Sequence, residues 1–418
     1  TTAGATVTVL ERGAGPGGRS GSAPLRVGDQ EWRFDQGAEF IGSFYRATRY
    51  LAQQAGMSRN DLVRLPLEGR IVIDGQRFPM PTSMRAMMRT PLLSRSSKRR
   101  VVTLGGRLGA RSAPSWSRLA EYADLDDRDA AGYFAEVVGR DYAERILPAT
   151  MDALMLSPSA VTSRVVGMAQ FASAPGAHLY APRGGLGALW AAVADRLSVR
   201  YRTSVTGLRT VDDGVLVDTT DGDELRADAV VLAGPASLAA DLLPDGHPDL
   251  PLARDAEFSP VVKLHLALAA PTAGQYPVCP AGAGRHALAG VAPLESRQTG
   301  QVPAGRGGLE ICASSVLSRE LFGETDRVIR TMLLAECERL LGGPVGDILG
   351  WSVVRLSEGV PLFRVGWLRR LREHAAQAEV RDGAAARIRI AGDWLSSPSV
   401  EGAVRSALRA CALLLRGR

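Results

Sequence analysis

With 418 residues, 45% of them hydrophobic, the chain has the composition of an ordinary globular protein and is long enough for two or three domains. It has no apolar run of the roughly 18 residues that a membrane-spanning helix needs, and its four scattered cysteines argue against a zinc site or a disulfide framework, so we expect a reducing cytoplasm. The net charge of +6 comes almost entirely from arginine, and no aromatic and basic recognition motif accompanies it, so we expect no nucleic acid partner.

The first predicted element is an apolar strand over residues 7–11 that ends in the carboxylate of Glu11. Residues 13–18 fit the pattern G-x-G-x-x-G, but a phosphate-binding turn must lead into a helix, and residues 20–35 alternate like strands instead. We therefore interpret residues 7–11 as the second strand of a Rossmann unit, with Glu11 placed to bind the adenosine ribose. The first strand and its glycine turn would then precede Thr1.

The loop after this strand carries two glycines and an arginine. Gly17 and Gly18 would let backbone amides approach a pyrophosphate, and Arg19 would neutralise its charge. The alternative is a tight turn with an exposed arginine that follows an ordinary strand.

The next segments change from strands to helices. Residues 69–81 alternate around Gly75 and predict a β-hairpin. Helical patterns dominate residues 83–180, with one helix from Ala130 to Gly139 behind an acidic cap and another over 149–156. A basic cluster over residues 84–100 would suit an anionic membrane surface or the mouth of an apolar substrate site, although a solvated helix face is the simpler interpretation.

The second half returns to strands. A glycine turn leads into a helix over 187–197, a strand covers 199–205, and two hairpin turns follow. Residues 229–234 are apolar on both faces, as expected of a parallel strand covered by helices. Further strands are predicted at 261–268, 308–315 and 388–393, with helices at 326–341 and 400–415.

Lys263 lies inside the apolar strand 261–268, where a charge is costly to bury unless it has a partner. Lysine occurs elsewhere only at Lys98, so its retention here suggests a function. Alternatively, Lys263 points outward from an edge strand. The five histidines show no spacing typical of a metal site or a catalytic triad, and we expect no metal.

Three stretches together resemble the flavin-containing amine oxidase and protoporphyrinogen oxidase superfamily. They read V-T-V-L-E and G-G-R over residues 7–19, F-D-Q-G-A-E-F over 34–40, and A-G-D with S-V-E-G-A-V-R-S over 391–406. In that family a G-x-G-x-x-G turn lies about twenty residues before the glutamate. It is missing here, so we expect the chain to be part of a longer protein.

The resemblance implies an α/β fold (α+β overall), in which a GR2-type FAD-binding Rossmann-like domain carries an inserted mixed-sheet substrate domain and a helical cap. The implied FAD-binding domain is discontinuous and consists of residues 1–66, 181–250 and 380–418. Residues 67–82 and 251–379 would form the substrate domain, and residues 83–180 the helical cap.

The resemblance also implies roles for individual residues. Lys263 would be catalytic, bridged by water to the flavin, where it helps reoxidation by oxygen. The implied cofactor-binding residues are Glu11, Gly17, Gly18, Arg19, Gly37, Ala38, Gly184, Gly185, Val205, Gly392, Asp393, Glu401, Gly402 and Ala403. The amide end of the last helix would favour negative charge on the reduced cofactor.

Residues 351–367 suggest the substrate class. They are similar to a protoporphyrinogen oxidase segment, with Phe363 in place of its tyrosine and Trp367 in place of its histidine, and we take both as substrate-binding. Arg70 would meet a substrate carboxylate unless it is a surface arginine. No cysteine lies between Cys337 and Cys411, so the resemblance implies non-covalent FAD.

We therefore expect an FAD-dependent oxidoreductase that removes hydride from a C–H or C–N centre of an apolar or cyclic small molecule, with O2 as electron acceptor. The alternatives are a flavin amine oxidase, a carotenoid-type desaturase, or a flavin-free binding protein derived from the family. A homodimer and a peripheral membrane contact stay open.

Overall fold

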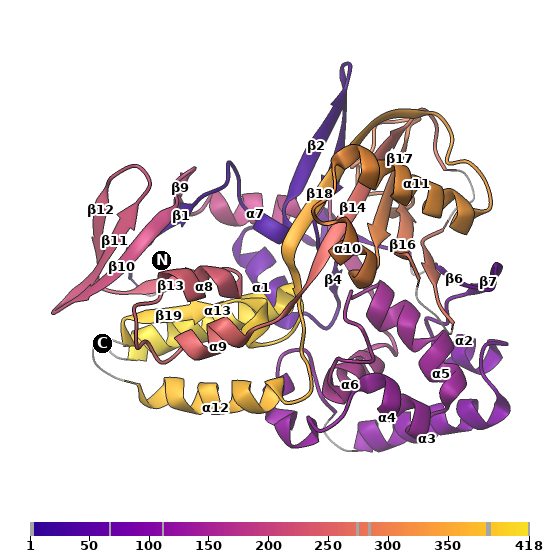
Figure 1. The fold of residues 1–418 in the computed structure, drawn as a ribbon, viewed down its shortest axis with the longest axis horizontal. Coiled ribbons are helices and arrows are strands. Elements are labelled where there is room, and N and C mark those ends of the chain that lie inside the picture. The colour runs from indigo at the N-terminus through magenta and orange to yellow at the C-terminus, as the bar shows by residue number, and fades with distance from the viewer. Residues whose placement is uncertain are drawn as a thin grey trace.

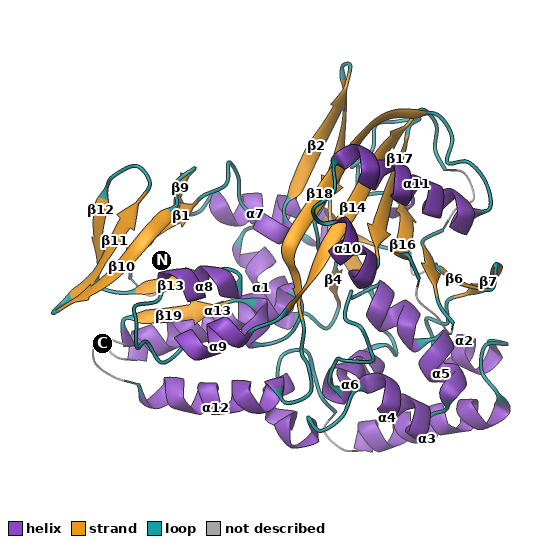
Figure 2. Cartoon of the chain, in the orientation of Figure 1, coloured by secondary structure: helices purple, strands orange, loops and turns teal. Residues whose placement is uncertain are grey.

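The computed structural model describes residues 4–66, 68–110, 113–272, 276–282, 286–381 and 386–416. Figure 1 shows three neighbouring parts: paired parallel strands with their helices, a large twisted sheet, and a group of helices below that sheet. The colouring of Figure 2 separates them, since strands gather in the large sheet and helices in the lower group.

The first part contains two pairs of parallel strands. β1 pairs with β9, and β13 with β19, so segments from both ends of the chain meet segments from its middle. A three-stranded antiparallel sheet, β10-β11-β12, lies beside them. The elements are β1 (Thr8–Glu11), β9 (Ser198–Tyr201), β10 (Val205–Val211), β11 (Gly214–Thr219), β12 (Glu224–Ala227), β13 (Val230–Ala233), β19 (Ile388–Ala391), α7 (Gly187–Ala194), α8 (Ala236–Leu242), α9 (Leu250–Asp255), α12 (Trp367–Val380) and α13 (Val400–Arg416).

Short strands connect this part to the rest. β2 and β3 form an antiparallel ribbon, and β8 lies between β4 and β5 in a small sheet. Their bounds, with the neighbouring helix, are β2 (Ser22–Val27), β3 (Gln30–Asp35), β4 (Ile41–Gly42), β5 (Leu62–Arg64), β8 (Leu179–Pro182) and α1 (Arg46–Gln54).

The large sheet has seven strands in the order β18-β14-β17-β16-β15-β6-β7. Only β15 and β6 pair in parallel. Its elements are β18 (Ile348–Pro361), β14 (Phe258–Leu268), β17 (Gly307–Ala313), β16 (Leu288–Pro293), β15 (Val278–Pro280), β6 (Arg70–Ile73), β7 (Gln76–Pro79), α10 (Ser315–Leu321) and α11 (Asp326–Leu341). The two helices pack on it over a core that includes Leu264, Ile311 and Leu333, so burial of these apolar side chains holds the layers together.

The helical part covers most of the expected cap. Its elements are α2 (Met84–Arg89), α3 (Arg95–Ala110), the 3-10 helix η3 (Leu119–Leu125), α4 (Ala130–Val137), α5 (Arg140–Arg145), the π-helix η4 (Pro148–Ala153) and α6 (Arg164–Ser173). α4 begins where expected, because the side chain of Asp129 accepts a hydrogen bond from the amide of Gly132 at 2.7 Å.

Several expected elements end earlier than their patterns suggested, and two of them have an evident local reason. The helix expected over 149–156 is the π-helix η4, because the side chain of Asp152 accepts from the amide of Ser159 at 2.9 Å and turns the chain away. The strand expected over 199–205 ends at Tyr201. Arg202 has a left-handed φ of 57° there, and its amide donates to the carbonyl of Gly13 at 3.0 Å.

The mixed α/β fold class is confirmed. The seven-stranded sheet draws its strands from residues 70–79 and 258–361, and the parallel pairs draw theirs from 8–11, 198–201, 230–233 and 388–391. The exact division into domains stays a prediction. Among the described residues, no helix has both the length and the apolar character to cross a bilayer.

Candidate functional site

Arg19 joins three segments that are distant in the sequence. One terminal nitrogen, Nη2, donates to Asp393 Oδ1 at 2.8 Å, and the other, Nη1, donates to the carbonyls of Glu358 and Gly359 at 3.0 and 2.9 Å. The Arg19 side chain is 25% exposed. The loop after β1, the end of β18 and the segment after β19 therefore meet at one guanidinium, which confers geometric specificity as well as charge neutralisation.

The turn before Arg19 requires glycine. Gly17 and Gly18 have φ values of 103° and 49°, in the region that side chains rarely adopt. The amide of Ala38 donates to the Arg19 carbonyl at 3.3 Å, and a Cβ at Gly37 would lie 2.5 Å from that carbonyl oxygen. A Cβ at Gly18 would meet nothing within 4 Å, so its backbone faces open space that a ligand can approach.

Glu11 closes β1 at its carboxyl end. One of its carboxylate oxygens, Oε1, accepts from the amide of Gly13 at 2.6 Å, which fixes the side chain against the following turn. The backbone carbonyl of Glu11 accepts from the amide of Thr203. Val205 begins β10 at a register irregularity in its pairing with β11. Glu11 and Val205 therefore both lie near the end of the β1–β9 pair.

The glycine turn before α7 is held from two sides. Gly184 donates its amide to the carbonyl of Thr299 at 2.7 Å, and a Cβ at Gly185 would lie 2.8 Å from Asp35 Oδ1. Asp35 accepts from the amide of Leu186 at 2.8 Å and from the hydroxyl of Ser22 at 2.6 Å. This buried carboxylate thus fixes the start of α7, and burial raises its pKa.

Glu401 lies at the start of α13 and is fully buried. Its carboxylate accepts from the amides of Ala47 and Thr48 at 3.0 and 2.9 Å, from the Thr48 hydroxyl at 3.0 Å and from the Ser117 hydroxyl at 3.2 Å. These bonds cap α1 and join it to α13. The Glu401 carboxylate is thus occupied by the start of α1 and by Ser117, so its part in binding the flavin would be to position α13.

The other residues of the last motif are held by their neighbours. Gly392 donates its amide to the Ser406 hydroxyl at 2.9 Å. Ser399 accepts from the amides of Gly402 and Ala403, at its hydroxyl and its carbonyl respectively, both at 3.1 Å. A Cβ at Gly402 would lie 2.0 Å from the carbonyl oxygen of Ser397, so α13 packs here without room for a side chain.

Lys263 does not lie on an edge strand. β14 runs between β17 and β18, where Lys263 faces Cys312 on one side and Val354 on the other. The residue is 2% exposed. Its ammonium donates to the carbonyl of Gly37 at 3.0 Å and to the carboxylate of Glu39. The structure therefore brings Lys263 to the 34–40 segment, directly beside Gly37.

The pair of Lys263 and Glu39 extends into a buried charge network. Arg297 Nη2 donates to the second oxygen of Glu39 at 2.6 Å and to Glu310 Oε2 at 2.5 Å, and Arg297 Nη1 lies 3.9 Å from Asp35. The network, as we use the term, comprises Asp35, Glu39, Lys263, Arg297 and Glu310. His265 borders it, stacked on Phe34 with 4.5 Å between ring centroids and 3.7 Å from Glu310.

The charges of the network explain its protonation. Burial alone would raise the pKa of Glu39, but Lys263 and Arg297 hold that pKa at about 2. Burial would lower the pKa of Lys263, and Glu39 and Glu310 instead raise it above its ordinary value. Burial raises the pKa of Glu310 to about 7, and the neighbouring carboxylates Glu39 and Asp35 add to this rise. Burial lowers the pKa of His265 to about 3, so this ring is neutral.

The three expected substrate-binding residues lie apart from the network. The Arg70 guanidinium lies over the Tyr276 ring at 4.2 Å. Phe363 has no exposed surface, and Trp367 donates its ring N–H to the carbonyl of Trp394 at 3.1 Å, so both belong to the hydrophobic core. Their substrate role stays a prediction.

Sequence reasoning missed most of the network. Glu39 follows Gly37 and Ala38, two implied cofactor-binding residues, in the 34–40 motif. This position could have marked Glu39 as a site residue. Arg297 and Glu310 carried none, since strand pairing brings Glu310 to the sheet of Lys263, and Arg297 reaches the network from a 3-10 helix (Glu295–Arg297) that follows β16. Among the described residues, no group of three or more His, Cys, Asp or Glu side chains is arranged to hold a metal ion.

The residues present fit an FAD molecule. A carboxylate ends β1 at Glu11, the backbone at Gly18 faces open space, and the first turn of α13 is fixed at Glu401. Carboxylates suit ribose hydroxyls, and open glycine amides and helix amino ends suit phosphates. These features define a flavin-binding fold.

Comparison with known proteins identifies the family. The sequence profile described as flavin containing amine oxidoreductase matches residues 1–415, and the chain belongs to this family. It is therefore an FAD-dependent oxidoreductase of the amine oxidase family. No curated protein sequence matches the chain.

Several solved structures share the fold. A protein of Exiguobacterium sp. 255-15 assigned as a protoporphyrinogen oxidase is 17% identical, with a TM-score of 0.75 over 98% of this chain and 93% of that one. Cyclohexylamine oxidase from Brevibacterium oxydans IH-35A is 16% identical, with a TM-score of 0.71 over 99% and 94%. A putrescine oxidase bound to putrescine is 17% identical, with the same TM-score and coverage.

We expect Glu310→Gln to remove part of the pH dependence of stability. The carboxyl of Glu310 has a pKa of about 7 when folded and an ordinary value of 4.5, so its stabilising effect is complete below pH 4.5 and is lost as pH rises through 7. This loss amounts to about 3 kcal/mol at most. Denaturant unfolding of wild type and variant between pH 5 and 8 measures it. The exposed Glu379→Gln serves as control, and identical pH profiles for wild type and Glu310→Gln would contradict the assignment.

We expect Gly402→Ala to lower the free energy of unfolding by about 1–3 kcal/mol, because the added methyl group collides with the Ser397 carbonyl. Gly105→Ala in α3 is the matched control, since a Cβ there meets nothing within 4 Å and the change should stabilise by about 1 kcal/mol. Urea denaturation at one pH compares the two. Equal effects would show that the close packing of α13 is unimportant.

Proposed function

We propose that the protein removes hydride from a C–H or C–N centre of an apolar or cyclic small molecule and is reoxidised by O2, in the manner of a protoporphyrinogen oxidase. The observation that carries this proposal is the buried Lys263, which donates to the carbonyl of Gly37 where the implied cofactor-binding segment 34–40 meets the seven-stranded sheet. The porphyrinogen-like substrate rests on the similarity of residues 351–367.

Non-covalently held FAD would supply the redox chemistry by accepting the hydride. Glu11 would hold the ribose, and the amides of Gly17 and Gly18 the pyrophosphate. Arg19 would act mainly by keeping Asp393 in place, because both of its terminal nitrogens already bind protein acceptors. Gly37 and Ala38 would place the 34–40 segment against the cofactor, and Glu401 would fix the direction of α13.

Lys263 would remain a cation throughout the reaction. Glu39 and Glu310 raise its pKa, so it cannot serve as a proton acceptor near neutral pH. Gly37 and Glu39 use two of its three N–H donors, which leaves one donor for a water molecule or for the cofactor. A fixed positive charge in a buried site stabilises negative charge that develops during reoxidation.

We expect Lys263→Met to slow reoxidation by O2 about 100-fold, as removal of one preorganised electrostatic group commonly does. Anaerobic reduction by substrate should change much less, because hydride removal does not need this cation. Stopped-flow absorbance of the flavin follows both half-reactions. Lys98→Met, which replaces the chain's other lysine, is the control, and unchanged reoxidation in Lys263→Met would refute the catalytic role.

The substrate class is tested by offering porphyrinogen, amine and polyene substrates to the protein under oxygen. We expect porphyrinogen oxidation with consumption of O2. Turnover of amines alone would overturn the porphyrinogen-like assignment in favour of an amine oxidase, and turnover of polyenes alone would favour a desaturase.

A further inference from the structure

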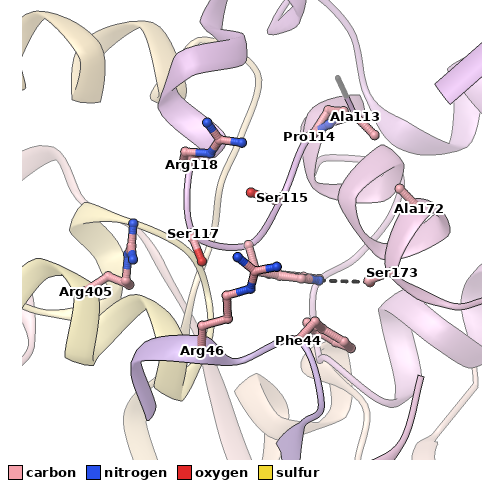
Figure 3. A pocket seen from close by; sticks show the side chains of 11 residues that line it. Phe44, Arg46, Ala113, Pro114, Ser115, Ser117, Arg118, Ala172, Ser173 and Arg405 are labelled. Atoms are coloured by element: carbon pink, nitrogen blue, oxygen red, sulfur yellow. Dashed lines mark hydrogen bonds between the residues drawn. The ribbon is translucent and has the colours of Figure 1, made fainter. Parts of the chain in front are cut away.

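A pocket apart from the candidate flavin site lies between α1, α13 and the helical part, with a volume of about 620 Å³. Figure 3 shows three arginines around it, Arg46, Arg118 and Arg405, with the hydroxyls of Ser115 and Ser117 among them. Its lining includes no aspartate or glutamate among the described residues and shares no residue with the candidate flavin site.

The three arginines come from separate elements. Arg46 is the first residue of α1, Arg118 precedes η3, and Arg405 lies in the second turn of α13. Within the described part of the chain, the side chains of Arg46 and Arg405 neither donate a hydrogen bond nor form an ion pair. Arg118 pairs only with Glu121 at 3.4 Å, and the two side chains are 51% and 58% exposed, so this pair is weak.

A carboxylate does lie behind the wall of the pocket. Glu401 accepts from the Ser117 hydroxyl, but it is fully buried, and the amides of Ala47 and Thr48 already bind its oxygens. Its charge is therefore committed to capping α1 and only partly offsets the arginines. The described lining of the pocket thus carries three guanidinium groups and no carboxylate, a charge that an anion would complement.

The pocket also has an apolar wall. Phe44 and Trp116 line it, with 6.4 Å between their ring centroids, and Trp116 is fixed by a hydrogen bond from its ring N–H to the Ser173 hydroxyl at 3.1 Å. Aromatic side chains with a few charged groups are typical of small-molecule sites. The guanidinium fork matches the oxygens of phosphate and carboxylate groups.

We propose that this pocket binds a small organic anion, with its phosphate or carboxylate group held by Arg46, Arg118 and Arg405 and its apolar part against Phe44 and Trp116. The site is independent of the proposed reaction. Ser117, which also lines the pocket, donates to Glu401 at the start of α13.

Isothermal titration of the FAD-loaded protein with phenyl phosphate tests the proposal, with inorganic phosphate as the comparison. We expect phenyl phosphate to bind more tightly than inorganic phosphate. The double variant Arg46→Gln/Arg405→Gln should weaken binding of phenyl phosphate at least about tenfold, since it removes two charge-assisted contacts. Arg319→Gln/Arg327→Gln, on α10 and α11, makes the same change in net charge away from the pocket and should bind like wild type.

Thermal melting and the flavin spectrum verify that each variant folds and retains FAD. If the double variant does not fold, the single changes Arg46→Gln and Arg118→Gln, both at exposed side chains, replace it and should each weaken binding. No binding of phenyl phosphate to wild type would overturn the proposal. Equal affinities in wild type and in the folded pocket variants would overturn it as well.

Discussion

The buried network around Lys263 is the interaction on which the candidate site depends. Two cations, Lys263 and Arg297, share three carboxylates from β3, β17 and the 34–40 segment. Removing one partner from such a set leaves an uncompensated buried charge, which commonly costs about 3–5 kcal/mol. The network therefore fixes how the N-terminal segment meets the seven-stranded sheet, and with it the place where Lys263 reaches the implied cofactor residues.

The network also decides what Lys263 can do. A buried lysine without partners would lose its proton near neutral pH and become a base. Glu39 prevents this, because its carboxylate holds the ammonium and its second oxygen is held by Arg297. The network holds one carboxylate more than it has cations. Burial raises the pKa of Glu310 to about 7, so this carboxylate binds a proton more readily than an ordinary glutamate does. Lys263 is thus a permanent cation, suited to stabilising negative charge.

Sequence reasoning recovered the architecture well where periodicity or caps were strong. The hairpin β6–β7 turns at Asp74 and Gly75, both with positive φ, and α11 has the bounds that its pattern predicted. It failed at Arg202, where a bond to distant Gly13 accompanies the end of β9, and after Ala153, where local side-chain bonding replaces the helical pattern. The site was recovered in part, because motifs marked Lys263 and the 34–40 segment but nothing local marked the partners of Glu401.

The sequence by itself determined the family, the α/β fold class and the use of FAD, because these depend on motifs whose residues are neighbours in the chain. Only the tertiary structure decided that Lys263 is buried and paired, that Glu401 caps α1, and that three arginines line one pocket apart from the candidate flavin site. These facts depend on contacts between segments hundreds of residues apart, and strand pairing and helix packing set such contacts rather than any local pattern.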